Sequence, residues 1–224
     1  MKDFEKSIIP GITSFNGKGW KRKLMEVEKL GITRVGLFLE EIDSRNNNEL
    51  FDLLLKSNIK EIPLVHIKES TTCEDINFLI KNFKSKYFTI HESDFKNLEK
   101  WKSLYKKLFL EMNFDDYVSK NVKVKKIGGF CIDLSHFKAS WDLITDDFKY
   151  VIERKNFKKY FKCNHLNGYS YKENRDLHRI NSLKNFDYLK SLPSFIFGDV
   201  IALEMYNSIS EQLKFKKYIV KMLG

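Results

Sequence analysis

Apolar residues in this chain gather in short runs that alternate with amphipathic segments of helical length. Eight runs have the length of a β-strand and cover residues 7–15, 34–40, 59–66, 87–91, 108–112, 130–133, 161–166 and 200–205. Between the runs, apolar residues recur every three or four positions, which is the spacing of one helix face. From Trp20, for example, Leu24 and Val27 follow in step, and Gly31 is a stop signal. We therefore predict helices over residues 20–30, 49–57, 74–83, 94–105, 141–154, 183–192 and 210–222.

The alternation of strands and helices predicts parallel strands that are joined by crossover helices. Eight such units favour an α/β fold of the closed (β/α)₈ TIM-barrel type, compact and with short loops. An open doubly wound sheet is the alternative, but no Gly-x-Gly-x-x-Gly motif follows the first strand. With 224 residues, 3 prolines and no linker-like stretch, the chain is expected to form one domain over residues 1–224.

The composition leaves the kind of partner open. Lys and Arg number 40 against 30 Asp and Glu, which gives a formal charge of +10. Such a charge favours a polyanionic partner, nucleic acid or a phosphorylated substrate, but a lysine-rich solvated surface explains it equally well. Three cysteines without a C-x-x-C motif indicate a reducing cytoplasm. The charged start and the absence of ~18 consecutive apolar residues predict a cytoplasmic protein with no membrane segment.

Ionisable residues lie where the predicted strands end. The stretch Gly128–His136 begins with two glycines and ends in Asp133-x-x-His136, which places a carboxylate and an imidazole in one small volume. The other strands end in the same residue types. The full set is His66, His91, Glu111, Asp133, His136, His165 and Glu204, together with Asp176 and His178, which lie as Asp-x-His in the polar loop after the seventh strand. In a barrel these ends meet at one mouth, where the active site sits.

The residues two positions back along each strand point in the same direction. They are small or apolar residues suited to a packed barrel interior: Leu64, Thr89, Phe109, Cys131, Cys163 and Ala202.

Each member of the set has a simpler interpretation when it is considered alone. A lone histidine is more often a surface or core residue than a ligand. Glu111 and Glu204 could pair with lysines, Asp133 could cap the following helix, and Cys131 and Cys163 read as packing. Taken together, crowded carboxylates would repel one another and be costly to desolvate, so we expect cations to compensate them.

The order of these residues resembles the metal-ligand series of the endonuclease IV family, within the xylose-isomerase-like TIM-barrel superfamily, from about the first strand to the eighth. The resemblance implies up to three Zn²⁺ ions, with Mn²⁺ or another divalent metal as an alternative. It implies that Glu111 bridges two metals and that Asp133 and Glu204 hold the same cluster. His66 and His91 would bind one zinc with Glu111. The remaining ligands would be His136 near His165 for a second zinc, and Asp176 with His178 for the third.

The chain departs from that family in its loops. Endonuclease IV proteins are longer and insert bulky residues into the DNA minor groove, whereas residues 67–72 carry no aromatic wedge. The loop over residues 41–45 is acidic where a phosphate contact would favour arginine. The segment between His165 and Asp176 is also short. The metal centre is therefore better supported than DNA as the substrate.

Two enzymatic functions follow from the resemblance. The first is a metal-dependent phosphodiester hydrolase that cleaves DNA at abasic sites through a metal-activated water. Its catalytic residues would be Glu111, Glu204 and His136, and its phosphate contacts would be Lys18, Arg175 and Arg179.

The second is a sugar or sugar-phosphate isomerase or epimerase with one divalent metal on Glu111, Asp133, His165 and Glu204. In it Glu111 and Glu204 would act as acid and base, and His136 could orient the substrate. A non-catalytic barrel is the third alternative.

Overall fold

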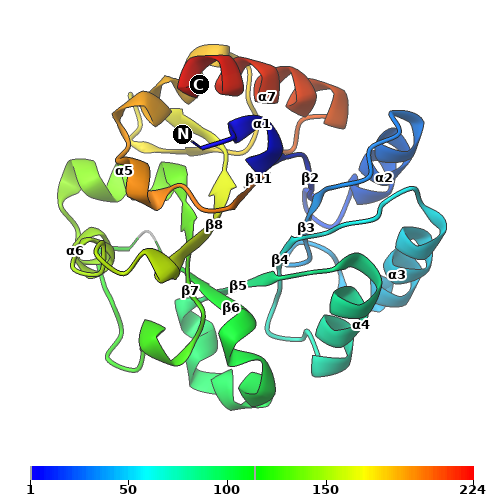
Figure 1. The fold of residues 1–224 in the computed structure, drawn as a ribbon, viewed down its shortest axis with the longest axis horizontal. Coiled ribbons are helices and arrows are strands. Elements are labelled where there is room, and N and C mark those ends of the chain that lie inside the picture. Colours follow the sequence, from blue (N-terminus) through cyan, green and yellow to red (C-terminus); the bar gives the residue numbers. More distant parts are fainter. Residues whose placement is uncertain (1, 114) are drawn as a thin grey trace.

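The structure, a computed structural model, describes residues 2–113 and 115–224. Its strands lie at the centre with the helices around them (Figure 1). Eight consecutive pairings join nine strands in the order β1-β11-β8-β7-β6-β5-β4-β3-β2. The strands are β1 (Ile8–Ile9), β2 (Gly11–Ile12), β3 (Gly36–Phe38), β4 (Leu64–His66), β5 (Tyr87–His91), β6 (Leu108–Glu111), β7 (Gly129–Asp133), β8 (Phe161–Leu166) and β11 (Val200–Leu203).

The first strand closes the ring. Pro10 divides it into β1, which pairs with β11, and β2, which pairs with β3, and all pairings in this sheet are parallel. Proline has no N–H for the ladder, so one strand serves two neighbours in turn. The eight-stranded α/β barrel that the sequence predicted is therefore confirmed.

The α-helices surround the barrel: α1 (Phe4–Ser7), α2 (Trp20–Lys29), α3 (Asn47–Lys56), α4 (Cys73–Phe83), α5 (Leu134–Leu143), α6 (Asp146–Ile152) and α7 (Ile209–Leu223). Shorter 3₁₀ segments cover Ser44–Asn46, Val124–Lys126, Lys158–Tyr160 and Ser194–Ile196. The segments predicted as helices over 94–105 and 183–192 have 3₁₀ geometry, over Glu92–Lys107 and Leu183–Ser191, and non-helical backbone at Asn97 and Trp101 interrupts the first. Helix α1 packs beside α7, so the two ends of the chain meet on one side of the barrel (Figure 1).

The helix predicted over 141–154 is wrong as a single element. Helix α5 begins seven residues earlier and ends at Leu143, because the φ of 55° at its C-cap, Ile144, takes the backbone into the left-handed region. Thr145 then accepts a hydrogen bond from the N–H of Phe148 and so starts α6. The periodic pattern continued across this break because both helices bury apolar residues on the same core.

Proline positions and the hydrogen-bond ladder determine where the strands begin and end. Strands β5 and β8 have the predicted limits, but β4 covers only the last three residues of the predicted 59–66 run. Pro63 precedes it, and without an N–H it cannot extend the ladder toward Ile59. The polar loop predicted after β8 contains an antiparallel hairpin instead, β9 (Gly168–Ser170) and β10 (Arg175–Leu177).

Two apolar layers hold the barrel together. The outer layer lies between the strands and the helices, and the inner layer fills the barrel with side chains of alternate strand residues. The inner layer consists of Ile9, Phe38, Leu64, Phe109, Cys131, Cys163, Val200 and Ala202. Five of the six residues predicted to face inward are in this list, and the sixth, Thr89, is fully buried beside His165.

Two glycines allow the narrow barrel to close. A Cβ on Gly36 would lie 2.6 Å from the Cβ of Ala202, and one on Gly11 would collide with the main-chain oxygen of Leu203. Both positions therefore require glycine for close approach of the backbones. None of the helices in the described part of the chain is long and apolar enough to cross a membrane.

Candidate active site

The predicted side chains meet at one end of the barrel, because parallel strands all present their carboxyl ends there. The ladder sets His91 beside Glu111 and Asp133 beside His165. Strand by strand, the side chains are His66 on β4, His91 on β5, Glu111 on β6, Asp133 on β7, His165 on β8 and Glu204 directly after β11.

Four buried side chains form what we call the floor of the mouth: His66, Glu111, His165 and Glu204. The Nδ1 atom of His165 lies 2.9 Å from Oε2 of Glu111 and 3.5 Å from Oε2 of Glu204. His66 Nδ1 approaches the same Glu111 oxygen at 3.6 Å. On its other side, His165 Nε2 lies 3.3 Å from the Thr89 hydroxyl. Two carboxyl groups therefore share one imidazole.

Five partly exposed side chains form the rim above it: Glu40, His91, His136, Asp176 and His178, with 24–36% of each side chain exposed. Asp176, on the hairpin strand β10, joins two of the histidines. Its Oδ2 lies 2.8 Å from Nε2 of His178, and its Oδ1 lies 3.8 Å from Nε2 of His136. His178 also places Nδ1 3.2 Å from the main-chain oxygen of Glu204, which ties the rim to the floor.

Glu40 is a member of the rim that our sequence interpretation missed. Its Oε2 lies 3.1 Å from His91 Nε2 and 3.2 Å from His66 Nε2, so it connects β4 with β5. Glu40 is the last residue of the apolar run 34–40, just as Glu111 and Glu204 stand at the ends of their runs. The rule that selected those two glutamates would have selected Glu40 as well.

Asp133 mainly caps a helix. Its Oδ1 accepts hydrogen bonds from the main-chain N–H groups of Ser135 and His136, both at 2.8 Å, and from the Ser135 hydroxyl. Its Oδ2 accepts from the Asn167 side chain at 3.0 Å. Both oxygens thus have partners, as in the simpler interpretation of Asp133 as the N-cap of the next helix.

Electrostatic pairing on the rim favours charged histidines. Burial opposes the charge on His91, but the hydrogen bond to Glu40 and the charge of Glu111 outweigh it and raise the pKa of His91 to about 9. Burial also opposes the charge on His136, but Asp133 and Asp176 outweigh it. At His178, Asp176 and Glu204 outweigh the same effect of burial. The pKa of each of these two histidines rises to about 10.

The same contacts act in the opposite direction on two rim carboxyls. Burial would raise the pKa of Glu40, but His66 and the hydrogen bond to His91 lower it to about 2. Burial also opposes ionisation of Asp176, and its bonds to His136 and His178 outweigh it and hold the pKa well below the usual range.

On the floor, the environment separates two similar carboxyl groups. Burial opposes ionisation of Glu111, but His165 and His66 outweigh it and lower its pKa well below the usual value. Burial dominates at Glu204 and raises its pKa to about 8. Burial opposes the charge on His165, but the Glu111 carboxylate at 2.9 Å outweighs it, and the pKa of His165 is raised. Burial lowers the pKa of His66 to about 4, so this ring is neutral near pH 7.

The crowded carboxylates are therefore compensated from within the protein. Imidazolium side chains of His91, His136, His165 and His178 stand beside the carboxylates, and Glu204 carries a proton near neutral pH. Our sequence argument required added cations because it treated these histidines as neutral. The pairing distances show that charged histidines are a second way to compensate the carboxylates.

Three groups in the described chain bring possible ligand atoms within 4.8 Å of one another: Glu40-His66-His91, His66-Glu111-His165 and Glu111-Asp133-His165-Glu204. Such spacing suits a cation, and it equally suits imidazole–carboxylate pairs. The three predicted phosphate contacts are exposed. Lys18 belongs to the turn in which its main chain bonds to Phe15, Arg175 pairs with Glu173 at 2.6 Å, and Arg179 lies at the surface beyond His178.

Comparison with known proteins gives little beyond the barrel. No family model matches the chain, and no curated protein matches it. Among solved structures, the chain is similar to an aldo/keto reductase from Klebsiella pneumoniae in complex with NADP and acetate. The two share 10% identity over 95% of this chain and 85% of that one, with a TM-score of 0.43.

The expected membership of the endonuclease IV family is wrong. No family model and no curated protein matches the chain, so only the order of the residues spoke for that family. The functions that rested on this resemblance are corrected too. They are the cleavage of abasic DNA by a metal-dependent hydrolase, a role in DNA repair, and the alternative sugar isomerase. Zinc and manganese as cofactors, which rested on the same resemblance, are corrected as well.

Proposed function

We propose that this barrel binds a small polar molecule at its carboxyl-terminal mouth and acts on it by proton transfer. One observation carries the proposal: Glu111 and Glu204 lie on the same nitrogen of His165, at 2.9 and 3.5 Å, and their pKa values are driven apart. Paired carboxyls whose environments separate their pKa values are a recurring arrangement for acid–base work.

The floor suggests a role for each group. Glu204, protonated near pH 7, is the general acid and delivers its proton to an oxygen of the ligand. Glu111 stays ionised, holds the His165 ring and keeps it charged. The positive imidazole then stabilises negative charge that develops on the ligand, within a mouth that is largely shielded from water.

The rim suggests where the ligand lies. His91, His136 and His178 are the partly exposed histidines, and their raised pKa values give the rim positive charge that favours a ligand with carbonyl, hydroxyl or carboxylate oxygens. Lys18, Arg175 and Arg179 stay predicted outer contacts for an anionic ligand. We retain the cytoplasm as the predicted compartment, because Cys73, Cys131 and Cys163 are all free thiols.

Binding tests the proposal first. We would measure the melting temperature of the protein with small carbonyl, hydroxy and carboxylate compounds, and with NADP and acetate, which the aldo/keto reductase binds. At least one compound should raise the melting temperature of the wild type. The apparent affinity of that compound should be at least tenfold lower in His178→Ala. Glu173→Gln, in the exposed turn of the hairpin, is the control. If His178→Ala binds the compound as tightly as the wild type does, the mouth is not the binding site.

Turnover tests the acid. With a compound that binds, and with NADPH supplied where the compound is a carbonyl, kcat/KM should fall as the pH rises past about 8, because Glu204 then loses its proton. Glu204→Gln should lower kcat by roughly 10²–10⁴, the usual contribution of a positioned acid. Unchanged turnover in Glu204→Gln would contradict the assigned role.

A further inference from the structure

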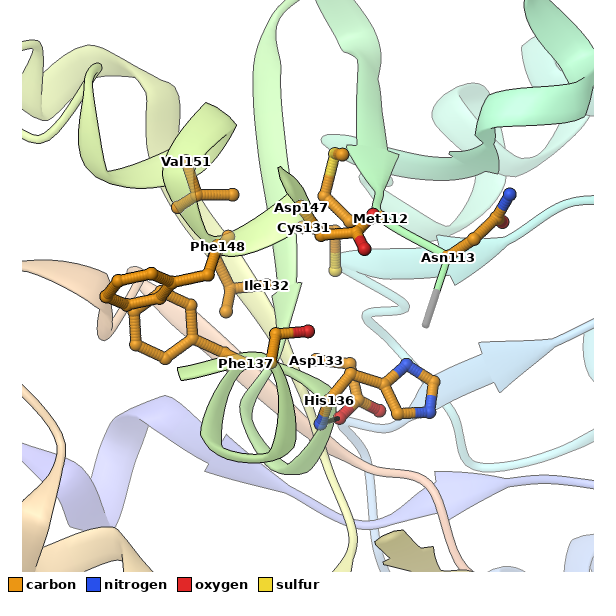
Figure 2. Close-up of a pocket in the computed structure, with 11 residues that line it drawn as sticks. Met112, Asn113, Cys131, Ile132, Asp133, His136, Phe137, Asp147, Phe148 and Val151 are labelled. Atoms are coloured by element: carbon orange, nitrogen blue, oxygen red, sulfur yellow. Dashed lines mark hydrogen bonds between the residues drawn. The ribbon is translucent and has the colours of Figure 1, made fainter. Parts of the chain in front are cut away.

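A second pocket opens beside the mouth, between the end of β7 and helices α5 and α6 (Figure 2). We call it the side pocket. Its wall is mostly apolar, formed by Met112, Ile132, Phe137, Phe148 and Val151. Its free volume is about 20 Å³, room for one water molecule or one small terminal group.

The polar end of the side pocket is the carboxylate of Asp147. Only 2% of this residue is exposed, and Figure 2 shows the carboxylate beside Met112 and Cys131. Its Oδ2 accepts a hydrogen bond from the N–H of Asp116 at 3.1 Å. Its Oδ1 is fully buried and has no hydrogen-bond partner among the described residues. A buried carboxylate oxygen without a donor is costly, which points to a donor that the pocket receives.

The charges around Asp147 select the kind of donor. Asp115 and Asp116 add negative charge at Asp147, and Asp147 adds negative charge at the buried Glu92. His136 is the cationic group on the pocket wall, and its Nε2 faces Asp176 at 3.8 Å. A water molecule would satisfy the open oxygen without offsetting this charge, whereas a cationic donor does both.

We propose that the side pocket binds a primary ammonium group, held by Oδ1 of Asp147, with the adjoining carbon atoms against Met112, Phe137 and Phe148. An ammonium group has the size of a water molecule and three donors, and a short alkyl arm suits the apolar wall.

Asp133 and His136 line the side pocket and also stand at the mouth, so the two sites adjoin. The ligand class is therefore a small polar molecule with a primary amine. The link to a substrate rests on the proposed function, and the binding of the ammonium group does not.

Ethylammonium chloride and ethanol form a matched pair of probes, alike in size and different in charge. Met112 lines the pocket, so its ¹³C-labelled methyl group reports occupancy by NMR, and Met25, which is 71% exposed, reports non-specific effects. Ethylammonium should shift the Met112 signal saturably, and ethanol should bind at least tenfold more weakly. Equal shifts with both probes, or no shift of Met112, would overturn the proposal.

Two variants of α6 complete the test. Asp147→Asn should weaken ethylammonium binding at least tenfold, because the amide removes the charge and keeps the shape. Asp146→Asn, whose side chain is exposed on the same helix, should leave the affinity unchanged. An unchanged affinity in Asp147→Asn would contradict the proposal, and if that variant does not fold, the wild-type comparison decides. Loss of activity in Glu204→Gln is a separate measurement, so the proposed function and the side pocket fail independently.

Discussion

Glu204 shows at the scale of one residue how burial sets the charge of a group. Its folded pKa of about 8 lies above the ordinary 4.5 because burial disfavours the carboxylate. Between these two values the unfolded chain releases this proton while the folded protein keeps it. The contribution of Glu204 to the free energy of unfolding therefore falls as the pH rises from about 4.5 to about 8 and is constant above.

The change Glu204→Gln should remove this dependence. We expect the melting temperature of the variant, relative to the wild type, to rise between pH 5 and pH 8, because only the wild type incurs the cost of the buried ionisable group. Thermal unfolding followed by circular dichroism at both pH values measures it, with Glu173→Gln as the exposed control. A difference that stays constant would show that Glu204 is already ionised in the folded protein.

His165 stabilises the folded protein through its close contact with the buried Glu111. The change His165→Leu leaves Glu111 buried without its closest partner and should cost about 3–5 kcal/mol in the free energy of unfolding. Adding Glu111→Gln removes the stranded charge, so the double variant should lose less than the sum of the single losses, by about 1 kcal/mol or more. Urea unfolding of the four proteins measures this coupling, and strict additivity would refute the pairing.

At the scale of the element, helix α5 depends on its N-cap residue, Asp133. Asp133 bonds two main-chain N–H groups of the first turn and the Asn167 side chain, all in a buried place. Asp133→Ala should therefore cost about 2 kcal/mol in the free energy of unfolding, the upper end for a helix N-cap. Thr72→Ala, at the exposed cap of α4, should cost about 1 kcal/mol. Equal losses in the two variants would show that burial adds nothing to the Asp133 cap.

Elements were predictable where one local rule governs them. The alternation of apolar residues located every barrel strand, and the limits of β5 and β8 were correct. The boundary between α5 and α6 was missed, because the left-handed turn at Ile144 uses a residue that carries no turn signal. The choice of 3₁₀ over α-helical geometry at Glu92–Lys107 depends on how the segment fits between β5 and β6, which periodicity does not encode.

At the scale of the whole molecule, Gln212 joins the last helix to the first strand. Its Oε1 accepts from the Gly11 N–H at 2.7 Å, and its Nε2 donates to the main-chain oxygens of Gly11 and Asn207. Gly11 lies where the first strand changes partners, so the side chain completes hydrogen bonds at the closing seam of the barrel.

Gln212→Leu should thus lower the free energy of unfolding by about 2–3 kcal/mol, because it leaves a buried main-chain N–H without an acceptor. Lys214→Leu, exposed on the same helix, is the control. Guanidinium unfolding of both variants gives the difference. If Gln212→Leu matches the control, the seam is held by the ladder and the core alone. That residues 1–224 form one domain stays a prediction.

The sequence by itself determined the barrel and the neighbourhood of its mouth. Strand periodicity fixes which side chains point inward, and parallel connection fixes that all strand ends meet, so His66, Glu111, His165 and Glu204 had to converge. Only the tertiary structure decided what these groups do to one another, because pKa values depend on distances of a few ångströms and on burial. Carboxylates pair with imidazoles, and Glu40 bridges two histidines, through contacts between residues far apart in the chain. The capping role of Asp133 and the open oxygen of Asp147 likewise depend on geometry that the residue type alone does not determine.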